Sequence, residues 1–217
     1  MMAVEITEEF VWQNIPRRPR DSHKGTFGSV LAVAGSAFYR GAALLAAEGA
    51  LRTGAGIVTL ASVEPVVSAA AARLLAEGGA FPHPAGELIV TPHPGEMARL
   101  TGLSAAQINA DREGTALRYA QAWNAVVVLK GARTVVAAPD GRVCVNPTGN
   151  PGLSRGGSGD VLAGVITALL GAGLPPLEAA ACGAWLHGAA GDRCAAELGQ
   201  YGMLPTDMLS ALPRLMK

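Results

Sequence analysis

The chain has few cysteines, few aromatic residues and few charges among its 217 residues. Its three cysteines, Cys144, Cys182 and Cys194, are odd in number and show no C-x-x-C spacing. This pattern argues against a disulfide framework or a zinc site and favours a reducing cytoplasm. Charged residues make up 16% of the chain, and 17 basic and 17 acidic side chains give a net charge of zero. That balance argues against nucleic-acid binding and gives no reason to expect a membrane surface.

Long hydrophobic runs are also scarce. The longest, Val161–Leu174, is too short to span a bilayer and stops before Pro175, so it predicts a buried helix. The N-terminal segment MMAVEITEEF lacks the positive-then-apolar pattern of a secretory signal. Since no internal repeat or linker divides the chain, we expect one domain over residues 1–217, with residues 1–22 as an N-terminal extension.

The chain does contain short apolar runs that alternate with Ala- and Leu-rich helical segments. The run AVVVLK is typical of a strand that is buried on both faces of a parallel sheet. Asp140-Gly141, between TVVAAP and RVCVN, predicts a hairpin. Strands are expected over 29–35, 57–61, 88–91 and 125–130, helices over 40–53, 64–77, 104–124, 160–172, 176–198 and 206–216, a short helix from Pro94, and a loop over 78–87. The sequence predicts an α/β fold with a central, mainly parallel sheet flanked by helices.

The sharpest motif is TGNPGLSRGGSGD, residues 148–160, which leads directly into an apolar helix. Backbone N–H groups of Gly157, Ser158 and Gly159 can converge on an anion at the helix N-terminus, where the helix dipole favours negative charge. The loop is neither a Walker A motif nor GxGxxG. Asp160 has two interpretations: a helix cap in a glycine turn, or a general base beside the anion hole.

Several motifs together carry a family resemblance. They are HKGTFGSVLAVAGS, YRGAALLAAEGALRTGAG, TPHPGEMARL, VVLKGARTVV, NPTGNPGLSRGGSGDVLAGVITALLGAGL and WLHGAAGD. From about His23 to Leu212, this series closely resembles the ADP- or ATP-dependent NAD(P)H-hydrate dehydratases of the ribokinase-like superfamily, which repair hydrated NADH and NADPH. The resemblance implies a ribokinase-like layered domain, smaller than usual for the family.

The resemblance assigns the nucleotide to the segment after the buried strand, together with Gly159. That segment consists of Lys130, Gly131, Ala132, Arg133 and Thr134. Its position fits, because ligands of open α/β sheets bind beyond the carboxyl ends of the strands. Either Lys130 or Arg133 can then interact with a negatively charged phosphate group. The alternative interpretation of this segment is an ordinary solvated basic turn.

On the substrate side, the resemblance implies contacts from Ala43, His93 and Asp160. Related vitamin-precursor kinases usually carry Asn where this chain has His93, so the histidine favours a dehydratase. The alternative for His93 is a loop residue without a role. Ala43 belongs to a loop and helix start that also includes Ser36, Tyr39, Gly41 and Ala42, for which helix packing is the stronger interpretation.

Three further residues have open interpretations. Glu96 can cap the helix that opens at Pro94, which we prefer, or help to hold a metal through water. His187 and Asp192 form either a structural pair near the nucleotide or direct contacts to it.

The resemblance also implies a reaction with ADP (or ATP) as co-substrate and Mg²⁺. Asp160 accepts the proton of the ring hydroxyl, and the terminal phosphoryl group passes to that oxygen. Elimination of phosphate then restores the dihydropyridine, leaving AMP when ADP is used. The Ala-rich helices and the resemblance favour a homo-oligomer, of which a tetramer is one form.

One departure from the family stands out. Between residues 56–77 and TPHPGE, the family has further strands and helices with a GPGxG loop and a DAD-type acidic motif, and this chain has only GGAFPHPAGE. The difference corresponds to about 50–60 residues. It leaves three alternatives in order of preference: a compact active dehydratase, another ribokinase-like small-molecule kinase, or a nucleotide-binding protein without turnover.

Overall fold

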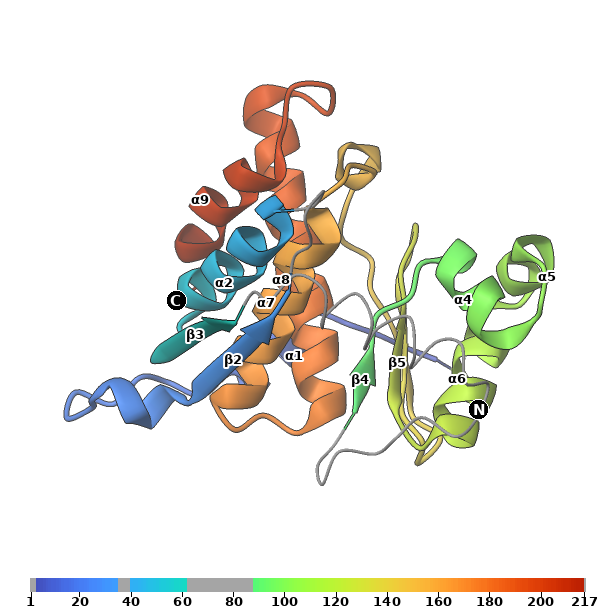
Figure 1. Cartoon of the computed structure of the whole chain (residues 1–217), viewed down its shortest axis with the longest axis horizontal. Helices are drawn as coiled ribbons and strands as arrows, with labels where there is room; N and C mark the ends of the chain where they lie inside the picture. The colour runs from blue at the N-terminus through green and yellow to red at the C-terminus, as the bar shows by residue number, and fades with distance from the viewer. Residues whose placement is uncertain (1–2, 35–39, 62–87, 217) are drawn as a thin grey trace.

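The computed structural model describes residues 3–34, 40–61 and 88–216 (Figure 1). The strands are β1 (Val4–Glu5), β2 (Ser29–Val33), β3 (Ile57–Ala61), β4 (Ile89–Val90), β5 (Val126–Leu129), β6 (Val135–Ala137) and β7 (Val143–Val145). The helices are α1 (Glu8–Asn14), α2 (Arg40–Thr53), α4 (Pro94–Thr101), α5 (Ala105–Ala110), α6 (Arg112–Trp123), α7 (Ser158–Gly171), α8 (Pro176–Leu198) and α9 (Pro205–Leu215), with 3-10 turns η1 (Lys24–Phe27) and η2 (Pro151–Leu153). The helix expected over 64–77 and the loop over 78–87 lie outside the described residues.

The larger of the two described sheets is mixed, not mainly parallel. Its order is β1-β7-β6-β5-β4, in which β4 and β5 are parallel, and β6 runs antiparallel to both β5 and β7. The cause is two short connections, since the two strands of a hairpin are antiparallel. The predicted Asp140-Gly141 turn joins β6 to β7, and residues 130–134 join β5 to β6. Gly141 adopts φ 101°, and the Asp140 carboxylate accepts the Arg142 N–H at 3.0 Å. Strands β2 and β3 form a separate parallel pair.

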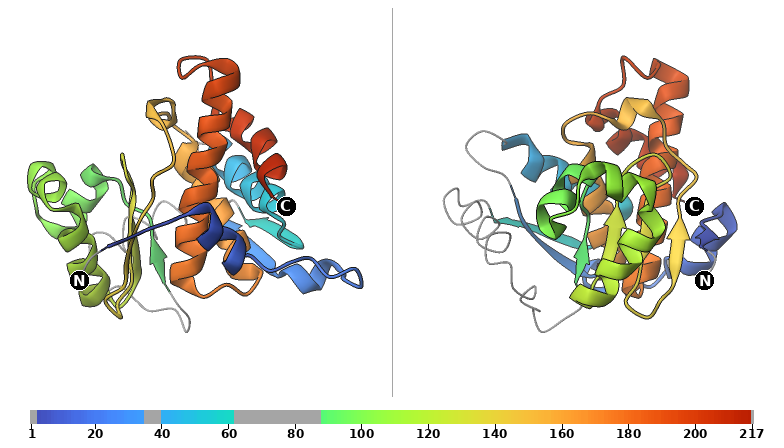
Figure 2. Two further views of the ribbon diagram at one scale, coloured as in Figure 1. Left: turned by 180° about the vertical axis from the view of Figure 1, so that it is seen from behind. Right: turned by 90° about the vertical axis from the view of Figure 1, so that its right-hand side faces the viewer.

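The five-stranded sheet lies between two layers of helices (Figures 1 and 2). Successive side chains of a strand point to opposite faces, and β5 shows this clearly. Val126 and Val128 join the core made with α7, α8 and α9, whereas Val127 and Leu129 join the core made with α4, α5 and α6. All four are buried, as the run AVVVLK predicts. This strand therefore ends in a protected position, and its last residues can support a site.

Helix α7 carries the glycine-rich motif and is held at close range by α2. A Cβ on Gly49 would lie 2.9 Å from the carbonyl oxygen of Val161, and a Cβ on Gly164 would overlap the carbonyl oxygen of Ala46. Two helices can approach so closely only where side chains are absent. Helix α7 is buried as predicted, and no helix in the described ranges has the length and apolar content to cross a membrane.

The prediction of a single helix over 104–124 is wrong in one respect, because the helix is interrupted at Asp111. Ser104 does cap α5, and its hydroxyl accepts the N–H of Gln107 at 3.2 Å. Asp111 then leaves helical geometry with φ −142° and ψ 76°, and its side chain accepts the N–H of Gly114 at 2.9 Å. An Asp that caps a new first turn competes with continuation of the old helix. Helix α6 therefore starts at Arg112, near the end of β5.

The first residues of the chain, expected only as an extension, take part in the fold. β1 pairs in parallel with β7, with Val4 opposite Cys144. Thr7 caps α1 by accepting the N–H of Phe10 at 3.1 Å. Ile6 and Val11 are buried in the core with α8. So short a segment shows little periodicity in its sequence. Its position depends on contacts with β7 and α8, which are distant in the sequence.

Candidate functional site

A pocket of about 650 Å³ opens where β5 ends and α7 begins. Its wall combines residues 130–134, the loop from Asn146 to Arg155, Ser158 and Gly159 of α7, His93, and His187. The structure thus brings together the residues that the sequence assigned to the nucleotide with His93 from the predicted substrate side. Gly157 and Asp160 flank the two α7 residues in the wall but are not themselves part of it.

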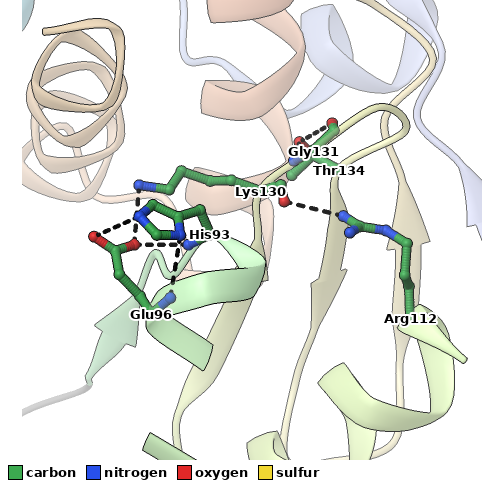
Figure 3. A network of polar contacts seen from close by, with 6 residues as sticks. All are labelled: His93, Glu96, Arg112, Lys130, Gly131 and Thr134. Carbon is green, nitrogen blue, oxygen red and sulfur yellow. Dashed lines mark hydrogen bonds and ion pairs between the residues drawn. The ribbon is translucent and has the colours of Figure 1, made fainter. Parts of the chain in front are cut away.

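Residues 130–134 form a tight turn at the end of β5 (Figure 3). The Lys130 N–H extends the strand by donating to the carbonyl oxygen of Pro92 at 2.9 Å. The Thr134 hydroxyl closes the turn, since it donates to the carbonyl oxygen of Gly131 at 3.0 Å and accepts the Gly131 N–H at 3.3 Å. Gly131 has φ 152° and Arg133 has φ 56°. Hydrogen bonds thus define the shape of the turn, although Gly131, Ala132 and Arg133 are exposed to solvent.

The two cations of this turn point to different places. The Lys130 Nζ lies 3.5 Å from Glu96 Oε2 and 3.3 Å from the position that a Cβ on Gly159 would take. Arg133 instead pairs with Glu5 of β1 at 3.1 Å, and both of those side chains are more than half exposed. Of the two candidates for phosphate charge, Lys130 is thus the one at the N-terminus of α7.

His93 and Glu96 form a reciprocal cap on α4. The Glu96 N–H donates to His93 Nδ1 at 3.1 Å, and the His93 N–H donates to Glu96 Oε2 at 2.7 Å. Glu96 is therefore a cap, as preferred from the sequence. Because Nδ1 acts as an acceptor, the ring carries its proton on Nε2. The His93 side chain is half-exposed, and its Nε2 lies 3.4 Å from Glu96 Oε1. Nε2 is thus the donor that His93 can offer to a ligand.

Gly157, with φ 98°, makes the turn into α7. No side chain caps this helix, so the interpretation of Asp160 as a cap is not supported. The Ser158 N–H donates to the carbonyl oxygen of Arg155 at 3.3 Å, whereas no described residue accepts a hydrogen bond from the N–H of Gly159. Of the three amides expected to form the anion hole, Gly159 is thus available and Ser158 is engaged over a long distance.

The carboxylate of Asp160 lies in the first turn of α7, and it has no hydrogen-bond donor among the residues that the structure describes. Partial burial raises the pKa of this carboxyl group, and the positive charge of Lys130 opposes that rise. A partly desolvated carboxylate without a donor is a stronger proton acceptor than one in water. The geometry therefore places a partly buried carboxylate next to an unengaged helix amide and near a lysine.

His187 and Asp192 of α8 stabilise the wall of the pocket from behind. His187 Nε2 lies 2.8 Å from the carbonyl oxygen of Ser158, and since a carbonyl only accepts, Nε2 carries the proton. Burial lowers the pKa of His187 to about 4, so the ring is neutral at neutral pH. Asp192 accepts the Gly149 N–H at 2.8 Å and the Asn150 side-chain amide at 2.9 Å. In this structure both side chains are engaged with protein groups.

Comparisons with known proteins decide the family. A model of the NAD(P)H-hydrate dehydratase family matches residues 60–214. The bifunctional NAD(P)H-hydrate repair enzyme of Moorella thermoacetica is 39% identical, with coverage of 98% of this chain and 53% of that protein. The ADP-dependent (S)-NAD(P)H-hydrate dehydratase of Bacillus subtilis is 33% identical, with coverage of 97% of each chain. The chain belongs to the NAD(P)H-hydrate dehydratase family.

Solved structures confirm the fold of this dehydratase-family chain. A crystal structure of the ADP/ATP-dependent NAD(P)H-hydrate dehydratase from Bacillus subtilis, co-crystallised with ATP/Mg²⁺, matches with a TM-score of 0.89 at 30% identity, over 99% of this chain and 98% of that chain. A ribokinase-like superfamily protein from Enterococcus faecalis matches with a TM-score of 0.83 at 24% identity, which shows the fold alone. The predicted ribokinase-like α/β fold is confirmed.

This dehydratase-family chain is shorter than its relatives. It spans about half the length of the bifunctional relatives it matches. Within the matched part, the alignment with the Moorella thermoacetica enzyme runs over 283 positions, which exceeds the 217 residues of the chain by 66, so the relative carries at least that many extra residues. The expected difference of about 50–60 residues is of this size. The segment at which we expect the difference, residues 78–87, lies outside the described residues.

The first substrate-side segment of this family member is only partly described. Ala43 is buried within α2, with 4% of its surface exposed, and it is not part of the pocket wall. Gly41 is exposed and Ala42 is half-buried. Ser36 and Tyr39 lie outside the described residues. A contact of Ala43 with the substrate stays a prediction.

Sequence reasoning missed two side chains of this dehydratase-family site. Asn146 is 3% exposed, and its side-chain amide donates to the carbonyl oxygens of Ala184 at 3.1 Å and Thr148 at 3.2 Å, which fixes the loop against α8. Arg112 reaches the end of β5 from α6. Asn146 lies within the quoted string NPTGNP. Nothing local in the sequence distinguishes an exposed Asn from one that is buried by contact with a residue 38 positions away.

The residues also bear on a metal. Within the described ranges, no three His, Cys, Asp or Glu side chains come together as a ligand set. Mg²⁺ at nucleotide sites is commonly held by one or two carboxylates, water and the phosphates themselves. The carboxylate of Glu96, which lies 3.5 Å from Lys130 Nζ, fits a site of that shared kind.

Proposed function

We propose that this chain is an ADP-dependent (S)-NAD(P)H-hydrate dehydratase that repairs hydrated NADH and NADPH (NADHX and NADPHX). One observation carries the proposal. The partly buried carboxylate of Asp160, which feels the charge of Lys130, directly follows Gly159 at the N-terminus of α7. Lys130 and Gly159 both line a pocket of about 650 Å³. That volume lies in the range of small-molecule sites. The names of its relatives supply the substrate class.

The chemistry follows from these positions. Asp160 accepts the proton of the ring hydroxyl as the oxygen forms a bond to the terminal phosphorus of ADP, and the bond between that phosphorus and AMP breaks. Lys130 and the Gly159 N–H stabilise the charge that develops on the phosphoryl oxygens. Cleavage of the carbon–oxygen bond then releases phosphate, which is a better leaving group than hydroxide. Loss of a proton from the adjacent ring carbon to water completes the double bond of the dihydropyridine.

The remaining site residues bind and orient. Residues 130–134 receive the nucleotide, and His93 offers its Nε2–H to the hydrated nicotinamide. A bound Mg²⁺ would supply positive charge to the phosphates, and Glu96 would help to hold it through water. Cys144, Cys182 and Cys194 are buried free thiols, which fits a reducing compartment, and we propose a cytoplasmic homo-oligomer.

The test is recovery of absorbance at the dihydronicotinamide band. The purified chain is incubated with NADHX, Mg²⁺ and either ADP or ATP, and Asp160→Asn serves as the matched variant because Asn keeps the shape and loses the base. Recovery that requires nucleotide and falls by roughly 10²-fold or more in Asp160→Asn supports the proposal. Recovery without nucleotide, or unchanged recovery in Asp160→Asn, contradicts it.

A second candidate is a nucleotide-binding protein without turnover. The shortening by at least 66 positions relative to the Moorella thermoacetica enzyme favours this candidate, because the expected loss falls on the substrate side. Calorimetry with ADP separates the two: binding without recovery of NADHX supports the second candidate. A vitamin-precursor kinase is the third alternative, and phosphorylation of an alcohol other than the hydrate would indicate it.

A further inference from the structure

Arg112, the first residue of α6, reaches across to the end of β5 (Figure 3). Its Nη2 donates to the carbonyl oxygen of Leu129 at 2.8 Å and to that of Lys130 at 3.2 Å. These are the carbonyl groups of the last strand residue and of the first residue of the turn 130–134. Carbonyl groups at the end of a strand normally accept hydrogen bonds from water or a ligand. Here one guanidinium group donates to both of them.

The contact costs Arg112 part of its hydration. Burial lowers the pKa of its guanidinium group, and its Nε is buried without a hydrogen-bond partner among the described residues. An exposed arginine would keep its donors in water. The hydrogen bonds to the two carbonyl oxygens therefore compensate for the lost hydration of the guanidinium group. The position of Arg112 and the position of the turn thus depend on each other.

Gly131 and Arg112 fit each other sterically. A Cβ on Gly131 would lie 2.9 Å from Arg112 Nη2 and 3.0 Å from Nη1. The guanidinium group thus occupies the space that a side chain at position 131 would need. Gly131 has φ 152°, and the residues that follow it, 132–134, line the pocket.

We propose that Arg112 is a positioning residue for the nucleotide. By holding the carbonyl groups of Leu129 and Lys130, it fixes the start of the turn and the direction in which Lys130 approaches Gly159. It does so without touching the nucleotide, because it is not part of the main pocket wall and borders a separate cavity of about 320 Å³ together with Asp111, Ala132 and Arg133. The inference rests on the proposed use of residues 130–134 for ADP.

The experiment compares Arg112→Met and Arg112→Lys with Arg118→Met, an exposed arginine on the same helix. ADP binding is measured by calorimetry, and kcat and the KM values for ADP and NADHX are measured separately. Arg112→Met is expected to weaken ADP binding about 10- to 100-fold with little change in the KM for NADHX. Arg112→Lys, with donors too compact to span both carbonyls, is expected to recover only part of the affinity. Arg118→Met is expected to bind ADP like the wild type.

Chemical rescue adds a readout that a purely structural role would not give. Free guanidinium at low millimolar concentration is expected to restore ADP binding to Arg112→Met, since the 320 Å³ cavity gives access to the vacated position. Wild-type affinity in Arg112→Lys, or an equal loss of affinity for ADP and NADHX, would overturn the inference. If Arg112→Met does not fold, Arg112→Lys decides alone. Failure of the wild type itself to bind ADP would instead overturn the proposed function.

Discussion

His187 donates its Nε2–H to the carbonyl oxygen of Ser158 over 2.8 Å. The bond links the middle of α8 to the first residue of α7, next to Gly159 and Asp160. The bond requires a proton on Nε2, and burial of His187 favours the neutral ring by lowering its pKa to about 4. The start of α7 is therefore held by a buried ring whose charge state depends on pH.

This dependence predicts a pH effect on stability. The pKa of His187 is about 4 in the folded chain and 6.5 ordinarily, so the unfolded chain binds more protons between these values. The contribution of His187 to the free energy of unfolding is complete above about pH 6.5 and is lost as the pH falls towards 4. We expect a loss of up to about 3 kcal/mol, at about 1.4 kcal/mol per pH unit. Urea unfolding at several pH values measures it.

The matched variant is His187→Gln, whose side-chain amide can still donate to Ser158 but does not titrate. Its free energy of unfolding should lack the component that the wild type loses between pH 6.5 and 4. Asp160, whose pKa is raised, contributes with the opposite sign and cancels in the difference. Identical pH profiles for the two proteins would contradict the assignment.

The two cations of residues 130–134 should differ in their effect on ADP binding. Lys130→Met removes the ammonium group next to Gly159, and we expect roughly 10- to 100-fold weaker binding, the usual effect of losing a charge-assisted contact. Arg133→Met removes only an exposed ion pair with Glu5, and we expect less than about a threefold change. Calorimetry on both variants tests this, and a larger effect at Arg133 would show that the ligand recruits it.

The close approach of α2 and α7 predicts a large effect from one methyl group. In Gly164→Ala, the new Cβ would overlap the carbonyl oxygen of Ala46, so the helices must separate, and overpacking of this kind costs about 1–3 kcal/mol. Gly41→Ala in α2 is the control, since no atom of the described residues lies within 4 Å of its Cβ position. It should be neutral or stabilising by up to about 1 kcal/mol. Equal free energies of unfolding for both variants would show that the helices yield freely.

Asp192 should matter for affinity more than for the chemical step. Its carboxylate accepts from the Gly149 N–H and from the Asn150 amide, and this fixes one wall of the pocket. Asp192→Ala removes both acceptors, and we expect a several-fold rise in the KM for ADP with kcat nearly unchanged. Steady-state kinetics with NADHX in excess measures both constants. A fall in kcat at constant KM would instead indicate that Asp192 acts on the transition state.

Much of the fold can be predicted from local pattern. The run AVVVLK, the Asp140-Gly141 turn and the glycine-rich start of α7 lie where the sequence indicates. Each depends on interactions within a few residues, such as the alternation of a strand or the positive φ of a glycine. The break at Asp111 was missed because an Asp is tolerated inside a helix, and only its cap on Gly114 shows that it starts a new one.

The sequence by itself determined the α/β class, the family resemblance and the residues that gather at the pocket, because strand ends and helix starts lie on one edge of such a sheet. Tertiary structure alone decided the incorporation of β1 and α1. It also decided which cation approaches the start of α7. Lys130 and Arg133 are three residues apart and equally basic in sequence, and only their distant partners, Glu96 and Glu5, separate their roles. Contacts across 34 and 128 residues leave no local signature.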